Sequence, residues 1–303
     1  MQASYKVSAF YQFIKLDETQ LNELKSAIEV FTGRVRGLII IGPEGINGTI
    51  SAIESDNQDF KAWLSGYLQL RQIENFEFRD SVCGFHPFRN LKVKIREEIV
   101  TLGNTEIVPN PSADDSHISP ELWDQMLTQN DVVCIDTRNW YETEIGKFAQ
   151  ALVPPIEEFQ EFPKFLKESG IDKSKKILMY CTGGIRCEKA VLDAKNQGYD
   201  QVYQLQGGIL NYLKQRPNSN FKGECFVFDN RVAVDQNLNP SEKFRLCPHC
   251  GQPALQPIDC LRCDSEALVC QSCLELGSEF RTCSKNCSYH YKLRPHLKGN
   301  RQV

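Results

Sequence analysis

The chain has 303 residues, of which 41% are hydrophobic, and 35 basic against 39 acidic residues give a formal net charge of −4. This length exceeds one small core and suits two or three domains, and the charge excludes a uniformly basic chain. A mean hydropathy of −0.40 is typical of a soluble globular protein, and no apolar run approaches the ~20 residues of a membrane span. The first residues show no basic segment followed by an apolar one, so we predict no signal peptide, no membrane binding and a cytoplasmic location.

Residues 1–103 alternate between the apolar periods of strands and of helices. Helical spacing predicts one helix from Leu21 to Phe31 and another from Phe60 to Leu68. Strands are predicted over residues 5–14, 35–41, 46–51, 76–78, 91–95 and 99–102. The order β-α-β-β-α-β is that of a ferredoxin-like (acylphosphatase-like) domain, whose sheet packs two helices on one face. We expect Gly42, Gly45 and Gly48 to serve a hairpin that requires positive φ.

A linker and then an α/β pattern follow. Residues 104–120 contain three prolines among small polar residues, which predicts a linker. From residue 121 to 217, strands over 132–135, 177–180 and 202–205 alternate with helices that include 187–197 and 209–213. This alternation predicts a parallel sheet covered by helices.

The loop after the strand at 177–180 is the strongest candidate site. It begins with Cys181 and ends with Arg186, and Gly183 and Gly184 allow the backbone to curl so that successive N–H groups, including those of Thr182 and Ile185, point at one spot. The following helix adds the positive end of its dipole, so an anion is stabilised there. The nearest anion is the sulfur of Cys181, and we predict a nucleophilic thiolate with a lowered pKa. The alternative is a structural cysteine with a solvated arginine.

Residues 218–303 form a third, small domain rich in cysteine. The eight cysteines after residue 246 come as four short pairs, Cys247 with Cys250, Cys260 with Cys263, Cys270 with Cys273, and Cys283 with Cys287. Each pair offers two thiolates to one tetrahedral ion, so four pairs predict two metal sites, with zinc as the candidate ion. Sequential and interleaved pairing remain open, as do reduced thiols without metal. His249 is expected to be a bystander, because sulfur alone completes both sites.

Basic residues concentrate in two stretches that lack acids. The first holds Arg89, Lys92, Lys94 and Arg96, and the second runs from residue 281 to 303. Both are candidates for contact with a polyanion such as RNA, and ordinary solvated charge explains them equally well. No G-x-G-x-x-G segment opens a βαβ unit, so we predict no flavin or nicotinamide site.

Several motifs resemble those of rhodanese domains and of one larger family. The loop from Cys181 to Arg186, the strand ending in Asp136-x-Arg138 and the closing Leu205-x-Gly207-Gly208 are similar to rhodanese motifs. With these, the segments Gly42-Pro43-Glu44-Gly45-Ile46-Asn47-Gly48-Thr49, His86-Pro87-Phe88, Asn139-x-Tyr141-Glu142 and Cys187-Glu188-Lys189 resemble the bacterial rhodanese-containing tRNA uridine-34 hydroxylases nearly end to end. The resemblance implies tRNA as partner, molecular oxygen as co-substrate, and hydroxylation of C5 of the wobble uridine.

For the mechanism, we hypothesise roles for individual residues. Cys181, as thiolate or persulfide, attacks C6 of uracil while Arg186 and the loop N–H groups hold the sulfur anion. Asp136 and Arg138 orient the loop by ion pairing. Cys187, beside the motif residue Glu188, is a candidate resolving thiol, but we expect it to point elsewhere as a packed cysteine.

Two other functions stay open. A plain sulfurtransferase needs only the central domain and a persulfide on Cys181. A non-enzymatic tRNA- or protein-binding module would use the rhodanese fold as a platform, although such a platform has no need for Cys181 and Arg186. The residues do not predict the oligomeric state or the reductant.

Overall fold

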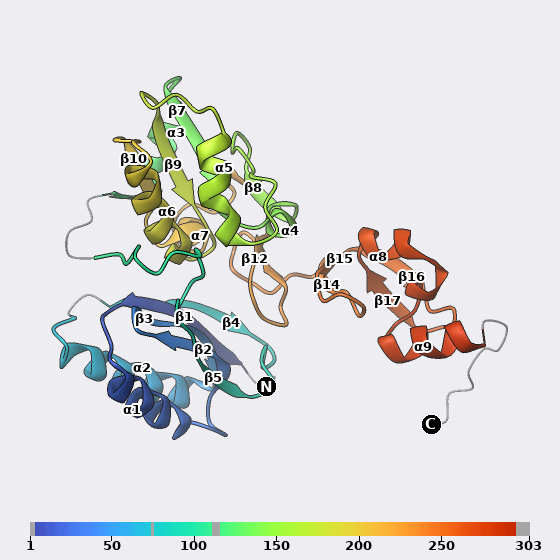
Figure 1. Ribbon diagram of the computed structural model, residues 1–303. Coiled ribbons are helices and arrows are strands. Elements are labelled where there is room, and N and C mark those ends of the chain that lie inside the picture. The colour runs from blue at the N-terminus through green and yellow to red at the C-terminus, as the bar shows by residue number, and fades with distance from the viewer. Residues whose placement is uncertain (1–3, 74–75, 111–115, 295–303) are drawn as a thin grey trace. The chain divides into compact units, whose positions relative to one another are not determined.

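Two units make up the chain in the computed structural model, which describes residues 4–73, 76–110 and 116–294 (Figure 1). The first unit holds residues Met1–Phe226 and Asp235–Asn239, and the second holds Val227–Val234 and Pro240–Val303. The N-terminal domain and the α/β domain both belong to the first unit. None of the helices in the described ranges has the length and apolar character needed to cross a membrane.

A five-stranded sheet organises the N-terminal domain. Its elements are β1 (Tyr5–Phe13), α1 (Glu18–Glu29), β2 (Arg36–Gly42), β3 (Gly45–Ala52), α2 (Glu54–Gln69), β4 (Arg79–Cys83) and β5 (Leu91–Ile95). The strand order is β4-β1-β3-β2-β5, and β5 runs parallel to β2 at the edge. Both helices cover one face of this sheet (Figure 1), where Phe10, Ile39 and Phe60 are buried in the core. The predicted ferredoxin-like, acylphosphatase-like fold is therefore confirmed.

Three local expectations for this domain were wrong. Residues 76–78 form no strand, because Phe76 and Phe78 pack edge-on against Phe10 and ladder pairing begins only at Arg79. Residues 99–102 form no strand either, because Glu98 accepts hydrogen bonds from the amides of residues 102 and 103 and turns the chain. Of the three hairpin glycines, only Gly45 has positive φ, at +145°.

The α/β domain contains a four-stranded parallel sheet in the order β6-β10-β9-β7. Its elements are β6 (His117–Ile118), α3 (Pro120–Leu127), β7 (Val132–Asp136), α4 (Trp140–Thr143), β8 (Gly146–Phe148), the 3-10 helix η1 (Phe159–Glu161), α5 (Phe162–Glu168), β9 (Lys176–Tyr180), α6 (Ile185–Asn196), β10 (Val202–Leu205) and α7 (Gly208–Gln215). Cys181 directly follows β9, so it lies at the carboxyl end of a parallel strand, where open α/β sheets bind ligands. The predicted rhodanese-like α/β class is confirmed, while residues 111–115 of the predicted linker lie outside the described residues.

A short segment predicted in the cysteine-rich domain pairs with the α/β domain instead. It contains β11 (Phe221–Gly223) and β12 (Cys225–Phe226), and β11 pairs antiparallel with β8. Apolar packing explains this pairing, because the Phe221 ring packs edge-on against Phe148, with the ring centroids 5.4 Å apart.

The second unit is built from short elements around buried cysteines. They are β13 (Ala233–Val234), β14 (Arg245–Leu246), β15 (Pro253–Ala254), β16 (Gln256–Asp259), β17 (Glu266–Val269), α8 (Gln271–Leu276), the 3-10 helix η2 (Ser278–Phe280) and α9 (Lys285–Leu293). Its small core combines Ile258 and Val269 with Cys247, Cys270 and Cys273. A core this small is the kind that structural metal ions or disulfides usually stabilise. The last residues of the predicted basic tail, 295–303, lie outside the described residues.

Candidate functional site

The reactive loop curls around the sulfur of Cys181. Gly184 has φ +103° and is the N-cap residue of α6, and this positive φ directs its amide to Cys181 Sγ at 3.1 Å. The amide of Arg186 also donates to this sulfur. The second glycine of the closing motif, Gly208, has φ +65°, and a Cβ there would lie 2.6 Å from the Cys181 carbonyl oxygen. Only glycine at position 208 therefore allows the closing motif to pack this closely against the backbone of the reactive loop.

The sulfur of Cys181 is an anion near neutral pH. Burial alone raises the pKa of this fully buried thiol. A hydrogen bond from Cys187, the charge of Arg186 and the amides of Arg186 and Gly184 outweigh burial and lower the pKa to about 6. Since the thiolate is the nucleophilic form of cysteine, the loop holds an activated sulfur at pH 7.

Cys187 does not point away from Cys181 as the sequence suggested. Because α6 begins at Ile185, Cys187 lies in its first turn, where side chains lean back toward the helix N-terminus. Its thiol therefore hydrogen-bonds to Cys181, while its sulfur lies 3.6 Å from the Thr137 hydroxyl. Burial, and then the neighbouring Cys181 sulfur, raise the pKa of Cys187 well above its usual value, so Cys187 remains a protonated donor.

The guanidinium of Arg186 is bound to a carboxylate rather than directed at the sulfur. It donates two hydrogen bonds to Glu142, at 2.5 and 2.8 Å, in a fork geometry that is strong and specific. Arg186 therefore acts on Cys181 through its charge and its backbone amide. The partner Glu142 is fully buried and was not among the predicted site residues, although it ends the Asn139-x-Tyr141-Glu142 motif.

Asp136 and Arg138 brace this arrangement from β7. Arg138 donates to both carboxylate oxygens of Asp136, at 2.9 and 2.7 Å, and both residues are fully buried. Arg138 also donates to the carbonyl oxygens of Gly146, at 2.6 Å, and Glu142, at 3.4 Å. The pair thus fixes α4, which carries the partner of Arg186.

The N-terminal domain contributes side chains that sequence reasoning missed. The Tyr11 hydroxyl donates to Glu188 at 2.7 Å and would lie 2.8 Å from a Cβ on Gly184. Arg79 donates to the Gly207 carbonyl oxygen at 3.3 Å, and its guanidinium lies 4.8 Å from the centre of the Tyr11 ring. No local sequence motif predicts these contacts, because Tyr11 and Glu188 are 177 residues apart.

Four further contacts, two of Glu188 and two of Lys189, hold α6 in place. Glu188 also lies 3.1 Å from the His117 Nε2 atom and accepts from Gln204 at 3.2 Å. The fully buried Lys189 forms ion pairs with Glu44 at 2.7 Å and Glu98 at 2.6 Å. Glu44 belongs to the glycine-rich hairpin motif, so that motif supplies a buried counter-ion as well as a turn.

The basic RNA-binding candidates lie apart from the reactive loop. Lys92 and Lys94 are exposed on the edge strand β5, Arg89 is exposed before it, and Arg96 follows it. Among the described residues, no hydrogen bond or ion pair joins any of these four to Cys181.

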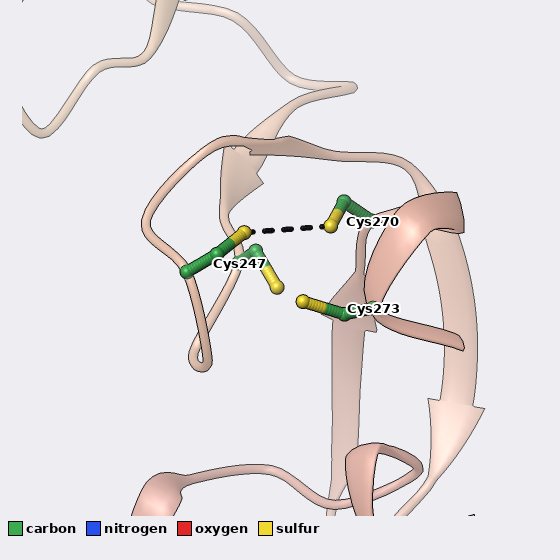
Figure 2. A group of neighbouring side chains, drawn as sticks. Cys247, Cys270 and Cys273 are labelled. Carbon is green, nitrogen blue, oxygen red and sulfur yellow. Dashed lines mark hydrogen bonds between the residues drawn. The ribbon is translucent and has the colours of Figure 1, made fainter. Parts of the chain in front are cut away.

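The eight cysteines of the second unit form two interleaved sets of four. The first set is Cys247, Cys250, Cys270 and Cys273, and the second is Cys260, Cys263, Cys283 and Cys287, with the sulfurs of each set within 4.8 Å of one another. Figure 2 shows the sulfurs of Cys247, Cys270 and Cys273 turned toward one another. The first and third pairs thus share one site and the second and fourth share the other, which excludes the sequential alternative.

The spacing of these sulfurs fits a tetrahedral ion. Four thiolates at a zinc–sulfur distance of about 2.3 Å lie about 3.8 Å from one another. In the second set, Cys263 lies 3.6 Å from Cys283 and 3.8 Å from Cys287, and in the first set Cys250 lies 3.5 Å from Cys270. His249 stays outside both sets, because its Nε2 donates to the Thr282 carbonyl oxygen at 2.8 Å. Both sets can therefore hold a metal ion.

Comparison with known proteins follows the same three-part division. Family models match a UPF0176 acylphosphatase like domain over residues 5–99, a rhodanese-like domain over residues 119–215 and a Rhodanase C-terminal region over residues 222–288. The solved rhodanese-like domain of an Anabaena protein is 20% identical and covers 36% of this chain and 80% of its own, with a TM-score of 0.31.

Curated relatives cover almost the whole chain. The tRNA uridine(34) hydroxylase of Bdellovibrio bacteriovorus is 47% identical over 99% of this chain and 85% of its own. A protein of the same name from a Wolbachia of Brugia malayi is 40% identical over 82% of this chain and 91% of its own. Another, from Wolbachia pipientis of Culex pipiens, is 36% identical over 91% of this chain and 96% of its own. The chain therefore belongs to the tRNA uridine(34) hydroxylase family.

Proposed function

We propose that this protein hydroxylates C5 of the wobble uridine of tRNA with molecular oxygen, and that Cys181 is its nucleophile. The observation that carries the proposal is the activated sulfur of Cys181, cradled by amides in a chain that belongs to this family. The tRNA substrate and the cytoplasmic location come with this function.

The first chemical step is addition of the Cys181 thiolate to C6 of the uracil ring. Addition at C6 moves negative charge to C5 and O4, so C5 becomes a carbon nucleophile that can capture oxygen. One oxygen atom stays on C5, and the other leaves as water with two electrons from an external reductant. Loss of the C5 proton with elimination of the thiolate from C6 then restores the double bond of the ring and frees the enzyme.

The loop stabilises the negative charge on the Cys181 sulfur both before it attacks C6 and when it leaves C6. Its amides and the charge of Arg186 already favour the anion before substrate arrives, so no reorganisation is needed when the thiolate leaves. Glu142 holds Arg186, and Arg138 holds the backbone carbonyl of Glu142, so these residues position the loop without touching substrate. Arg89, Lys92, Lys94 and Arg96 serve as contacts for phosphates of the tRNA.

Each four-cysteine set of the second unit would hold one zinc ion. The interleaved sets would then link segments from residue 247 to residue 287 into one small core. The ions would supply folding energy and no chemistry, because four thiolates leave no open coordination position.

A sulfurtransferase is the second candidate function. The favouring observation is the six-residue loop itself, since a buried thiolate ringed by amides also stabilises a persulfide. This activity would require only the α/β domain, so it would not explain the contacts that Tyr11 and Lys189 make between the two domains.

Purified protein with tRNA that lacks the modification separates the two functions. We expect 5-hydroxyuridine at the wobble position, carrying heavy oxygen when the reaction runs under isotopically labelled oxygen gas. Product without label would refute the oxygen-dependent reaction. Turnover of thiosulfate and cyanide, together with no tRNA product under any reductant, would replace the hydroxylase by the sulfurtransferase.

A further inference from the structure

The sheet of the N-terminal domain has one face that carries no helix (Figure 1). Strand register identifies its residues, because pairs directly opposite each other share a face. Tyr11 pairs with Asn47, Asn47 with Ile40, and Ile40 with Lys94. Along a second row, Arg79, Ala9, Thr49, Leu38 and Lys92 follow one another across the five strands. We call this surface the helix-free face.

The helix-free face is basic. The strand positions that share it include four cations, Arg36, Arg79, Lys92 and Lys94, and no Asp or Glu. Arg36, Lys92 and Lys94 are exposed, and in the described part of the chain none of the three takes part in an ion pair. The acid of β4, Asp80, instead bonds to Ser8 and Lys61 on the helix-covered side. The strand residues of the helix-free face therefore carry only positive charge.

The reactive loop meets this same face. Tyr11 and Arg79 both belong to it, and they contact the loop and its closing glycine motif through Glu188, Gly184 and Gly207. The exposed lysines lie on β5, three strands away from β1, which is about 14 Å at ~4.8 Å per strand. Between them lie Leu38 and Ile40 of β2 and Asn47 of β3, all half-buried, and the Asn47 side chain donates to the Ile99 carbonyl oxygen at 2.9 Å.

This arrangement fits a single-stranded stretch of RNA. RNA-binding sheets hold two or three splayed bases on their open face, usually by stacking on aromatic side chains, and contact the phosphates with basic side chains. On the helix-free face, Leu38 and Ile40 offer apolar contact for bases, and the β5 lysines offer charge for phosphates. A duplex presents its bases poorly to a flat sheet, whereas the unpaired bases of a tRNA anticodon loop are accessible.

We propose that the helix-free face binds the anticodon loop of tRNA, with phosphates on Lys92 and Lys94 and the target uridine delivered to Cys181 beside Tyr11 and Arg79. This proposal rests on the proposed function, because it names the surface that presents the substrate. It assigns the β5 lysines a defined place in a path that ends at the reactive sulfur.

Charge reversal on the face, with a matched control, tests the proposal. The variants Lys92→Glu and Lys94→Glu are compared with Lys25→Glu, an exposed lysine of α1 on the helix-covered side. Affinity for an anticodon stem-loop RNA is measured by fluorescence anisotropy over a range of salt concentrations. We expect each β5 variant to bind about ten-fold more weakly and to lower the salt slope by about one, while Lys25→Glu matches the wild type. Unchanged melting temperatures, expected for exposed sites, separate lost binding from lost folding.

Cross-linking gives the second measurement. A 4-thiouridine placed beside the target in the stem-loop should cross-link to peptides of β2 or β5. Cross-links to α1 or α2, or β5 variants that bind and turn over like Lys25→Glu while wild type makes 5-hydroxyuridine, would overturn this inference and leave the function standing. Cross-links on β2 or β5 without any hydroxylated product would support the surface and refute the function.

Discussion

Replacing Cys187 should deprive Cys181 of part of its reactivity without touching Cys181 itself. The Cys187 thiol donates a hydrogen bond to the Cys181 sulfur, and it is the first among the groups that offset the effect of burial on the Cys181 pKa. The variant Cys187→Ala removes this donor and keeps the loop amides and Arg186. Cys187→Ser keeps a donor of similar size, and Cys134→Ala, another buried cysteine, serves as control for cavity formation.

The expected magnitude follows from the strength of that bond. A hydrogen bond to a charged group contributes about 1.5–3 kcal/mol, and one pKa unit corresponds to about 1.4 kcal/mol, so its loss shifts the pKa by about 1–2 units. The Cys181 pKa, about 6 in the wild type, should therefore rise to about 7–8. At pH 7 the thiolate fraction would fall from about 90% to between about 50% and about 10%.

Thiolate absorbance in the ultraviolet measures this titration directly. The signal of each protein is taken relative to the same protein with Cys181→Ala, so that the eight cysteines of the second unit cancel. We expect a raised midpoint for Cys187→Ala and a midpoint near that of the wild type for Cys187→Ser and Cys134→Ala. A Cys187→Ala midpoint that coincides with the wild type would refute the idea that Cys187 holds the sulfur anion.

Three further predictions concern the metal sites, the buried lysine and pH. Cys247→Ser/Cys270→Ser should lose one bound ion and keep the other at wild-type affinity, whereas Cys247→Ser/Cys260→Ser should weaken both in chelator competition; the reverse pattern would indicate sequential pairing. Lys189→Met leaves two buried carboxylates without their cation, so denaturant titration should show the free energy of unfolding lowered by about 3–5 kcal/mol, and an unchanged value would contradict the buried ion pairs. Because folding lowers the Cys181 pKa, the unfolded chain binds one more proton than the folded chain between the two pKa values. Stability should therefore rise with pH from about 6 to about 9 by up to about 1.4 kcal/mol per pH unit, and this rise should vanish in Cys181→Ala.

Much of the fold was predictable because the local signals were strong. The buried run of β9, the Gly183-Gly184 turn and the apolar period of α6 together predicted where Cys181 lies and why its pKa is lowered. The three-domain fold class was predictable for the same reason, and it is confirmed. The strand at residues 76–78 failed because aromatic packing, rather than ladder pairing, decides the conformation there.

The contacts that complete the site could not be predicted from the sequence. They join residues far apart in the chain, or they depend on the residue at which a helix begins. Arg186 meets Glu142 from 44 residues away, and Tyr11 reaches Glu188 from another domain. The orientation of Cys187 depends on whether α6 begins at Ile185 or two residues later. The pairing of the metal sites was undecidable, because four pairs of equivalent thiolates combine equally well in either order.

The most direct test of the reactive sulfur uses cells that lack this gene. Such cells are complemented with the wild type, with Cys181→Ala or with the control Cys134→Ala, and their tRNA nucleosides are measured by mass spectrometry. Nucleosides derived from 5-hydroxyuridine should return with the wild type and with Cys134→Ala but not with Cys181→Ala at equal protein levels. Their return with Cys181→Ala would contradict the role of Cys181 as nucleophile.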